Sequence, residues 1–178
     1  MKKTVLIVLL FIAAQASAQN TSKSYIEKFK DDAIRIMHQT GIPASITLAI
    51  AMHESGCGNS VLAQHLNNQF GMKGNSVVVY KRRHKRVSTL YKQYNSIAES
   101  FEDFARVITE KKKFSGLSTK FTHYDYLGWV HGIQKAGYAS SRKWGAQVLS
   151  IITKYQLNTL DETPEAQPNL AAALDDVQ

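Results

Sequence analysis

The apolar run over residues 46–52 constrains the fold more than any other segment. Apart from Thr47 its residues are Ile, Leu, Ala and Met, and a helix that is apolar on all sides is buried. Glu54 follows this run and precedes a glycine-rich turn, Ser-Gly-Cys-Gly at residues 55–58. A carboxyl group shielded by apolar neighbours can keep a proton near neutral pH and donate it to a leaving group. Glu54 is therefore a candidate catalytic acid, and the alternative is a solvated glutamate at a helix end.

The first residues have the pattern of a secretory signal peptide. Lys2 and Lys3 precede an apolar stretch over residues 5–14, and Ala-Ser-Ala at residues 16–18 resembles a signal-peptidase site. The stretch is shorter than the about 20 residues that span a bilayer, and no second apolar run of that length follows. The sequence predicts a signal peptide over residues 1–18 and a chain exported to the periplasm or the extracellular space, without a stable membrane anchor. An uncleaved N-terminal anchor is the alternative.

Cysteine usage indicates how the exported chain is stabilised. Cys57 is the single cysteine, whereas a domain held by disulfides needs an even set. The fold must therefore depend on its hydrophobic core. Free cysteines are usually buried, so Cys57 is interpreted as a small buried side chain, with a nucleophile as the alternative.

The charge is concentrated in the central part of the chain. The formal net charge is +8; two lysines precede residue 19, and five acids without any Lys or Arg follow Leu157, so residues 19–157 carry +11. Such a charge favours an anionic partner, for which cell-wall carboxylates or phosphates are the prediction. The densest patch, at residues 81–86, lacks the interleaved aromatics of a nucleic-acid surface. No nucleic-acid partner is predicted, and the patch has a solvated hairpin tip as its alternative interpretation.

Apolar spacing predicts mostly helices. Capping signals are Pro43 at the start of the buried helix, Asn59 or Ser60 before the third helix, a capping box of Ser96 with Glu99, and Asp125. The predicted helices lie near residues 25–40, 44–54, 61–66, 97–108, 126–136 and 144–155. Two strands, at 77–80 and 87–94, form the single predicted sheet. Residues 158–178 are predicted to be an acidic disordered tail.

Several motifs, in order, resemble one family. They are Gly-Ile-Pro-Ala-Ser-Ile-Thr-Leu-Ala at 41–49, Glu-Ser-Gly at 54–56, Gly-Asn-Ser at 58–60, Asn-Asn-Gln-Phe-Gly-Met-Lys at 67–73, Tyr-Asn-Ser at 94–96 and Lys-Ala-Gly-Tyr-Ala at 135–139. Together they resemble the glucosaminidase family of bacterial peptidoglycan hydrolases, which includes flagellar rod-associated hydrolases and cell-separation autolysins. The resemblance covers roughly residues 24–157.

The resemblance implies a fold, a reaction and a partner. The implied fold is α+β, mainly helical and lysozyme-like, with a groove between a helical body and one small β-hairpin lobe. The implied catalytic domain over residues 19–157 is an endo-β-N-acetylglucosaminidase that cleaves the β-1,4 bond after N-acetylglucosamine in peptidoglycan glycan strands. No cofactor is implied, and the histidines show no metal-ligand spacing with acids or cysteines.

Site residues are carried over by position. Glu54 matches the family's catalytic acid, and Tyr138 resembles a groove-lining tyrosine that supports it. Asn68 and Phe70 match positions that flank the groove, although Phe70 suits the core equally well. Tyr94 is assigned to substrate binding with the same alternative. Of the other large aromatics, Tyr91 has the same two interpretations, groove or core, and Trp129 is expected in the core.

One departure from the family pattern bears on the mechanism. Many members carry a second acid in the β-lobe, but no Asp or Glu lies between Glu54 and Glu99. A two-carboxylate mechanism needs the pair roughly 5 to 9.5 Å apart, so a partner acid would have to be Glu99, Asp103 or Asp125. The alternatives are a single-acid mechanism, which we favour, and a weakened enzyme. A lytic transglycosylase and a wall-binding module without activity are the rival functions.

Overall fold

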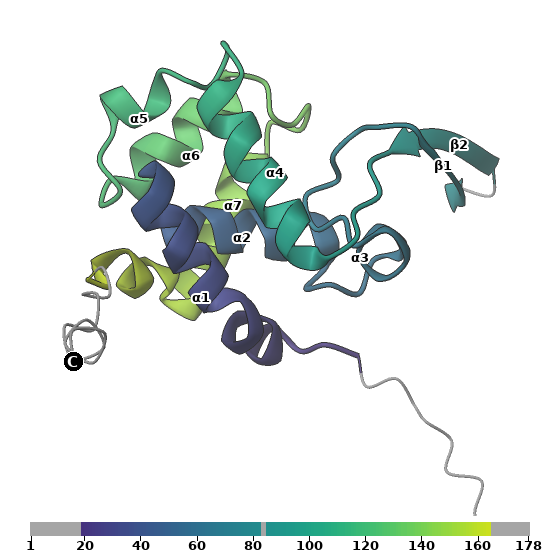
Figure 1. The fold of residues 1–178 in the computed structure, drawn as a ribbon, viewed down its shortest axis with the longest axis horizontal. Helices are drawn as coiled ribbons and strands as arrows, with labels where there is room; N and C mark the ends of the chain where they lie inside the picture. Colours follow the sequence, from purple (N-terminus) through teal and green to yellow (C-terminus); the bar gives the residue numbers. More distant parts are fainter. Residues whose placement is uncertain (1–18, 83–84, 165–178) are drawn as a thin grey trace, which may run out of the picture.

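The computed structural model describes residues 19–82 and 85–164, which form a helical body with one projecting β-hairpin (Figure 1). The fold is therefore α+β and mainly helical, as the sequence predicts. Over the described residues, no helix is long and apolar enough to cross a membrane. The elements in order are α1 (Ser22–Thr40), α2 (Ala44–Ser55), α3 (Val61–Leu66), β1 (Ser76–Arg82), β2 (Lys85–Tyr91), α4 (Ile97–Glu110), α5 (Leu117–Lys120), α6 (Tyr126–Lys135), α7 (Trp144–Tyr155) and the 3₁₀-helix η1 (Leu157–Glu162).

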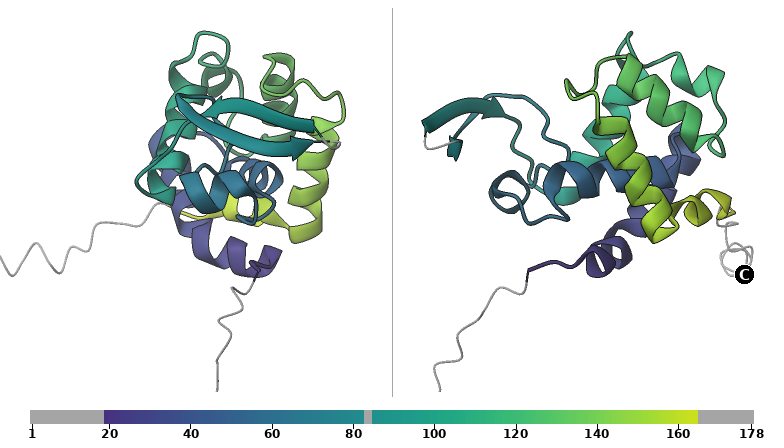
Figure 2. Two further views of the ribbon diagram at one scale, coloured as in Figure 1. Left: turned by 90° about the vertical axis from the view of Figure 1, so that its right-hand side faces the viewer. Right: turned by 180° about the vertical axis from the view of Figure 1, so that it is seen from behind.

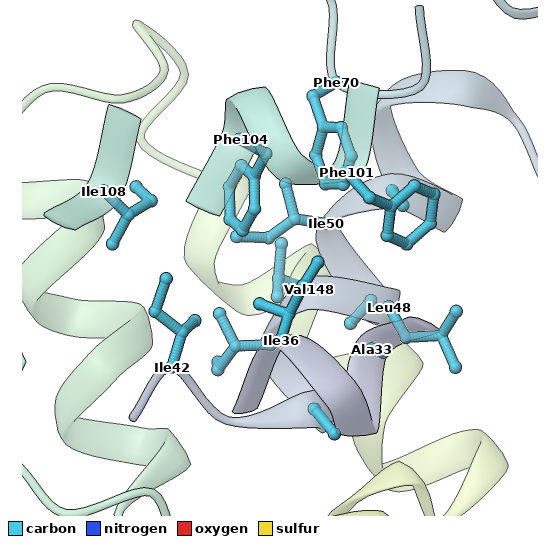
Figure 3. Close-up of a cluster of buried hydrophobic side chains, with 14 of the residues drawn as sticks. Ala33, Ile36, Ile42, Leu48, Ile50, Phe70, Phe101, Phe104, Ile108 and Val148 are labelled. Carbon is cyan, nitrogen blue, oxygen red and sulfur yellow. The ribbon is translucent and has the colours of Figure 1, made fainter. Parts of the chain in front are cut away.

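Helix α2 is the buried centre of the body. All its residues from Ala44 to Met52 are buried, and the helix contacts α1, α6, α7 and η1. Figure 3 shows Leu48 and Ile50 of α2 within a cluster to which α1, α4 and α7 also contribute. Truncating one such side chain to alanine costs about 2–5 kcal/mol of unfolding free energy. The predicted buried helix is confirmed, and its rigid packing fixes whatever lies at its end.

Local signals set most helix ends. Ser60 caps α3 and Asp125 caps α6, each by accepting a backbone N–H through its side chain. The capping box at the start of α4 forms only in part. Ser96 Oγ accepts the Glu99 N–H at 3.2 Å, but the Glu99 carboxylate accepts the N–H of Asn95 at 2.9 Å instead of that of Ser96. Glu99 therefore braces the chain just before α4.

The two strands form an antiparallel hairpin that projects from the body in Figure 1 and in the right-hand view of Figure 2. The predicted second strand, 87–94, is shifted: pairing runs from Lys85 to Tyr91. Beyond Tyr91 the backbone turns to another partner, since Lys92 N–H donates to Met72 O at 2.8 Å and Tyr94 N–H to Leu66 O at 3.0 Å. The side chains of the basic patch at residues 81–86 lie outside the described part, and their role stays a prediction.

The helical body extends beyond the predicted domain boundary at Leu157. Residues 157–162 form η1, in which Asp161 is only 2% exposed. Disorder from residue 158 onward is therefore a wrong prediction for residues 158–162, because composition alone does not reveal that one acid of the segment is buried against α2. The rest of the predicted tail after residue 164, and the predicted signal peptide at residues 1–18, lie outside the described residues.

Candidate active site

Glu54 lies in the last turn of α2 and faces a groove. The side chain is half-buried, and the groove has a volume of about 570 Å³. The groove lies between the base of the hairpin, the turn after α4 and the loop before α7. Its lining residues are Glu54, Leu62, Phe70, Gly71, Met72, Lys73, Tyr91, Lys92, Val107, Lys111, Lys113, Phe114, Tyr138, Ala139 and Ser140.

The turn after Glu54 is fixed by the next residue. Ser55 Oγ donates to the Ala51 carbonyl at 2.6 Å and accepts the Gly58 N–H at 2.7 Å. Residues 56–58 all have positive φ, and a Cβ on Gly58 would lie 3.1 Å from the Tyr25 ring. Glycine avoids both the left-handed strain and this close contact. The Glu-Ser-Gly motif thus stops α2 at a defined point and holds the carboxylate at the groove.

Trp144 holds one oxygen of the Glu54 carboxylate. The indole Nε1–H donates to Glu54 Oε1 at 2.9 Å, and the Trp144 side chain is 1% exposed. No residue in the described ranges donates a hydrogen bond to Oε2, and a Cβ added at Gly71 would lie 3.8 Å from it. The sequence-based prediction gave Trp144 only as the first residue of the last predicted helix, 144–155, and missed this role. The available signal was that a buried indole N–H needs an acceptor.

Tyr138 also lines this groove, and its supporting role in catalysis stays a prediction. Its hydroxyl donates to the Phe70 carbonyl at 3.4 Å, and its ring centroid lies 5.3 Å from that of Trp144. Burial, followed by the negative charge of Glu54, raises the pKa of Tyr138 well above its ordinary value. The phenol therefore remains a neutral hydrogen-bond donor throughout the physiological range.

Phe70 belongs to both the core and the groove. It is 3% exposed, stacks on Phe104 with centroids 4.3 Å apart, and meets the edge of Phe101 at 5.0 Å (Figure 3). Part of the residue still lines the groove. The two interpretations left open for Phe70 are therefore compatible, because its ring packs in the core while part of the residue lines the groove.

Known proteins with related sequences identify the family. The sequence profile described as mannosyl-glycoprotein endo-β-N-acetylglucosaminidase matches residues 30–157. The chain belongs to the glucosaminidase family of peptidoglycan hydrolases. This is a family of glycoside hydrolases, and its matched region contains all of the groove residues.

Individual relatives agree with this assignment. The chain is similar to the exo-glucosaminidase LytG of Bacillus subtilis, with 27% identity over 89% of this chain and 59% of LytG. It is also similar to the peptidoglycan hydrolase FlgJ of Vibrio cholerae, with 24% identity over 85% of this chain and 49% of FlgJ. The chain thus spans less than two thirds of the length of either relative.

A solved structure supports the lysozyme-like fold. The catalytic domain of the autolysin Auto from Listeria monocytogenes superimposes with a TM-score of 0.66. Sequence identity is 22%, and the match covers 83% of this chain and 92% of that domain. At this identity the likeness concerns the fold alone.

Asn68, a family motif position predicted to bind substrate, is not among the residues that line the groove. Its side chain is 1% exposed. The amide donates to the carbonyls of Met72 at 2.9 Å and Lys92 at 2.8 Å and accepts the Met72 N–H at 3.0 Å. The two bonds with Met72 hold the segment that enters the hairpin, and the bond to Lys92 joins that segment to the one that leaves it. Asn68 therefore clamps the base of the β-lobe, which corrects the predicted role.

Tyr94 is the second correction. Its hydroxyl donates to Asp103 at 2.7 Å and it does not line the groove. The Asp103 carboxylate also accepts hydrogen bonds from Lys92 Nζ at 2.7 Å and from the Arg106 guanidinium. Burial opposes ionisation of Asp103, but the hydrogen bonds from these three side chains together lower the pKa of its carboxyl. Tyr94 and Asp103 thus tie the hairpin exit to α4.

Each of the three candidate second acids has another partner among the described residues. Asp103 is 8% exposed and fully paired, Glu99 is bound to Asn95, and Asp125 caps α6. Of the residues that line the groove, Glu54 is the single carboxylate. Over residues 19–82 and 85–164, no three His, Cys, Asp or Glu side chains come close enough together to hold a metal ion.

Proposed function

We propose that this chain is an endo-β-N-acetylglucosaminidase that cleaves the β-1,4 bond after N-acetylglucosamine in peptidoglycan, with Glu54 as the general acid. The observation that carries the proposal is the Glu54–Trp144 pair at a groove, within the family's matched region. The predicted signal peptide at residues 1–18 would deliver the enzyme to the periplasm or the extracellular space.

The two oxygens of Glu54 have different tasks in this proposal. Oε1 is held by the Trp144 indole, so the carboxyl group keeps one orientation. Oε2 is the oxygen that carries the proton toward the glycosidic oxygen. Donation is needed because a sugar alkoxide is otherwise a poor leaving group. As the bond from the anomeric carbon to the glycosidic oxygen breaks, the proton moves from Oε2 to that oxygen.

A single-acid mechanism fits a groove with one carboxylate. N-acetylglucosamine carries its own nucleophile, since the acetamido oxygen can attack the anomeric carbon as the glycosidic bond breaks. Water then opens this cyclic intermediate and returns a proton to the Glu54 carboxylate. In this proposal the neutral hydroxyl of Tyr138, a residue that lines the same groove, exchanges its 3.4 Å hydrogen bond to the Phe70 carbonyl for one to the acetamido group or the water.

A groove with one carboxylate also suits a lytic transglycosylase. The reaction products distinguish this enzyme from a glucosaminidase. Purified peptidoglycan is digested with the protein, reduced, and analysed by mass spectrometry. Reducible N-acetylglucosamine ends are expected. Anhydro-sugar ends would reassign the reaction to a transglycosylase, and the absence of new ends from folded protein would leave a wall-binding module.

A further inference from the structure

The groove that holds a single carboxylate is lined by four lysines. Lys73 and Lys92 come from the base of the hairpin, and Lys111 and Lys113 come from the turn after α4. Lys92 is paired with Asp103 at 2.7 Å. The other three groove lysines, Lys73, Lys111 and Lys113, take part in none of the ion pairs between described residues.

Two of these three lysines are held in place by neutral groups. Lys73 Nζ donates to Thr89 Oγ1 at 3.1 Å and lies 3.8 Å from the centroid of the Tyr91 ring. Lys113 Nζ donates to the Gly137 carbonyl at 3.1 Å and lies 4.4 Å from the Phe114 centroid. These contacts fix the ammonium groups at the groove without neutralising them. Fixed, uncompensated charge of this kind attracts an anion.

Neutral sugars provide no partner for such charge, whereas peptidoglycan provides carboxylates. N-acetylglucosamine is uncharged. N-acetylmuramic acid carries a lactyl carboxyl group that is either free or joined to a peptide stem, and the stem itself bears carboxylates. Resting on the proposed function, we infer that Lys73, Lys111 and Lys113 bind a carboxylate of the substrate, so that the groove selects carboxylate-bearing glycan over neutral glycan of the same linkage.

The test measures binding and leaves the glycan intact. Protein carrying Glu54→Gln is sedimented with native peptidoglycan and with peptidoglycan whose carboxylates have been converted to amides by carbodiimide and ammonia. We expect amidation to weaken binding about tenfold at low salt, with a smaller ratio at high salt. Equal binding to native and amidated walls would overturn the inference, whatever the variants below do.

Matched lysine variants locate the recognition. Added to Glu54→Gln, the pair Lys73→Gln and Lys111→Gln is expected to remove most of the preference for native wall. The pair Lys23→Gln and Lys112→Gln removes the same charge from exposed positions outside the groove and is expected to retain the preference. If the groove pair still discriminates as strongly as its parent, the recognition lies elsewhere and the inference is wrong.

A third substrate distinguishes the two sources of the carboxylate. An amidase that removes the peptide stems leaves glycan with free lactyl carboxylates. If the protein still binds this glycan, the lysines recognise the lactyl carboxylate. If binding is lost, they recognise a carboxylate of the peptide stem, and either result supports recognition of a carboxylate. Because this readout uses the Glu54→Gln protein, a failure of the proposed hydrolysis appears separately, in the reducing-end assay with the unaltered protein.

Discussion

Asp161 caps the start of the helix that ends with the candidate acid. Its carboxylate accepts the Ser45 N–H at 2.8 Å and the Ser45 hydroxyl at 2.6 Å, across 116 residues of sequence. The residue before α2, Pro43, makes no side-chain cap of its own, so η1 supplies the missing acceptor. The C-terminal segment thereby supports the position of Glu54 from the opposite end of α2.

Asp161 is expected to make stability depend on pH. Burial, opposed by the hydrogen bonds from Ser45, raises the pKa of Asp161 to about 6, whereas an unfolded aspartate titrates near 3.9. The folded state therefore binds the extra proton between about pH 4 and 6. The contribution of Asp161 protonation to the free energy of unfolding is largest below about pH 4. It falls as pH rises from about 4 to 6, by roughly 3 kcal/mol at most.

Urea unfolding at pH 4 to 7 measures this dependence. Asp161→Asn keeps an acceptor for the Ser45 N–H and removes the titration, so the difference in unfolding free energy between the two proteins should shift in favour of the variant as pH rises. A difference that is constant from pH 4 to 7 would contradict the prediction.

Trp144→Phe is expected to lower turnover while the protein stays folded. The change removes the hydrogen bond to Glu54 Oε1 and keeps an aromatic ring in the core. Hydrogen bonds to charged groups contribute about 1.5–3 kcal/mol, so kcat should fall about tenfold to a hundredfold with little change in KM. Trp129→Phe is the matched control, because that buried indole donates to the Thr122 carbonyl and does not line the groove. Equal loss of kcat in both variants would indicate a general packing effect.

Glu54→Gln is expected to abolish turnover without unfolding the chain. The amide oxygen still accepts the Trp144 indole, but no proton can be donated, and general acid catalysis contributes about 10²–10⁴ in rate. Release of reducing ends from peptidoglycan is the measurement. Glu102→Gln, on the exposed side of α4, serves as control. Turnover of Glu54→Gln near that of the unaltered protein would exclude Glu54 as the acid.

Asn68→Ala is expected to act on stability. The change leaves the Met72 N–H and the Lys92 carbonyl without this partner and removes one of the two donors to the Met72 carbonyl, at a cost of about 3 kcal/mol. Urea unfolding should show this loss, while exposed Gln64→Ala should leave the unfolding free energy nearly unchanged. A raised KM with unaltered stability would instead restore Asn68 as a substrate-binding residue.

Much of the fold could be predicted from the sequence because its signals are local. The apolar run of α2, the Ser60 and Asp125 caps and the turn after Glu54 each depend on residues a few positions apart in the chain. Such neighbours meet in almost any packing of the chain. The resemblance to the family predicted in addition that Tyr138, which lies far from Glu54 in sequence, lines the groove.

The sequence by itself determined the helical class, the buried helix and the acid at its end. Tertiary structure decided what that acid meets: the Trp144 indole, 90 residues away, and a groove in which the described residues supply lysines and no second carboxylate. It also turned Asn68 and Tyr94 into supports of the hairpin. The physical reason is that polar groups buried by packing must find partners, and which donor reaches which acceptor depends on how distant segments are brought together.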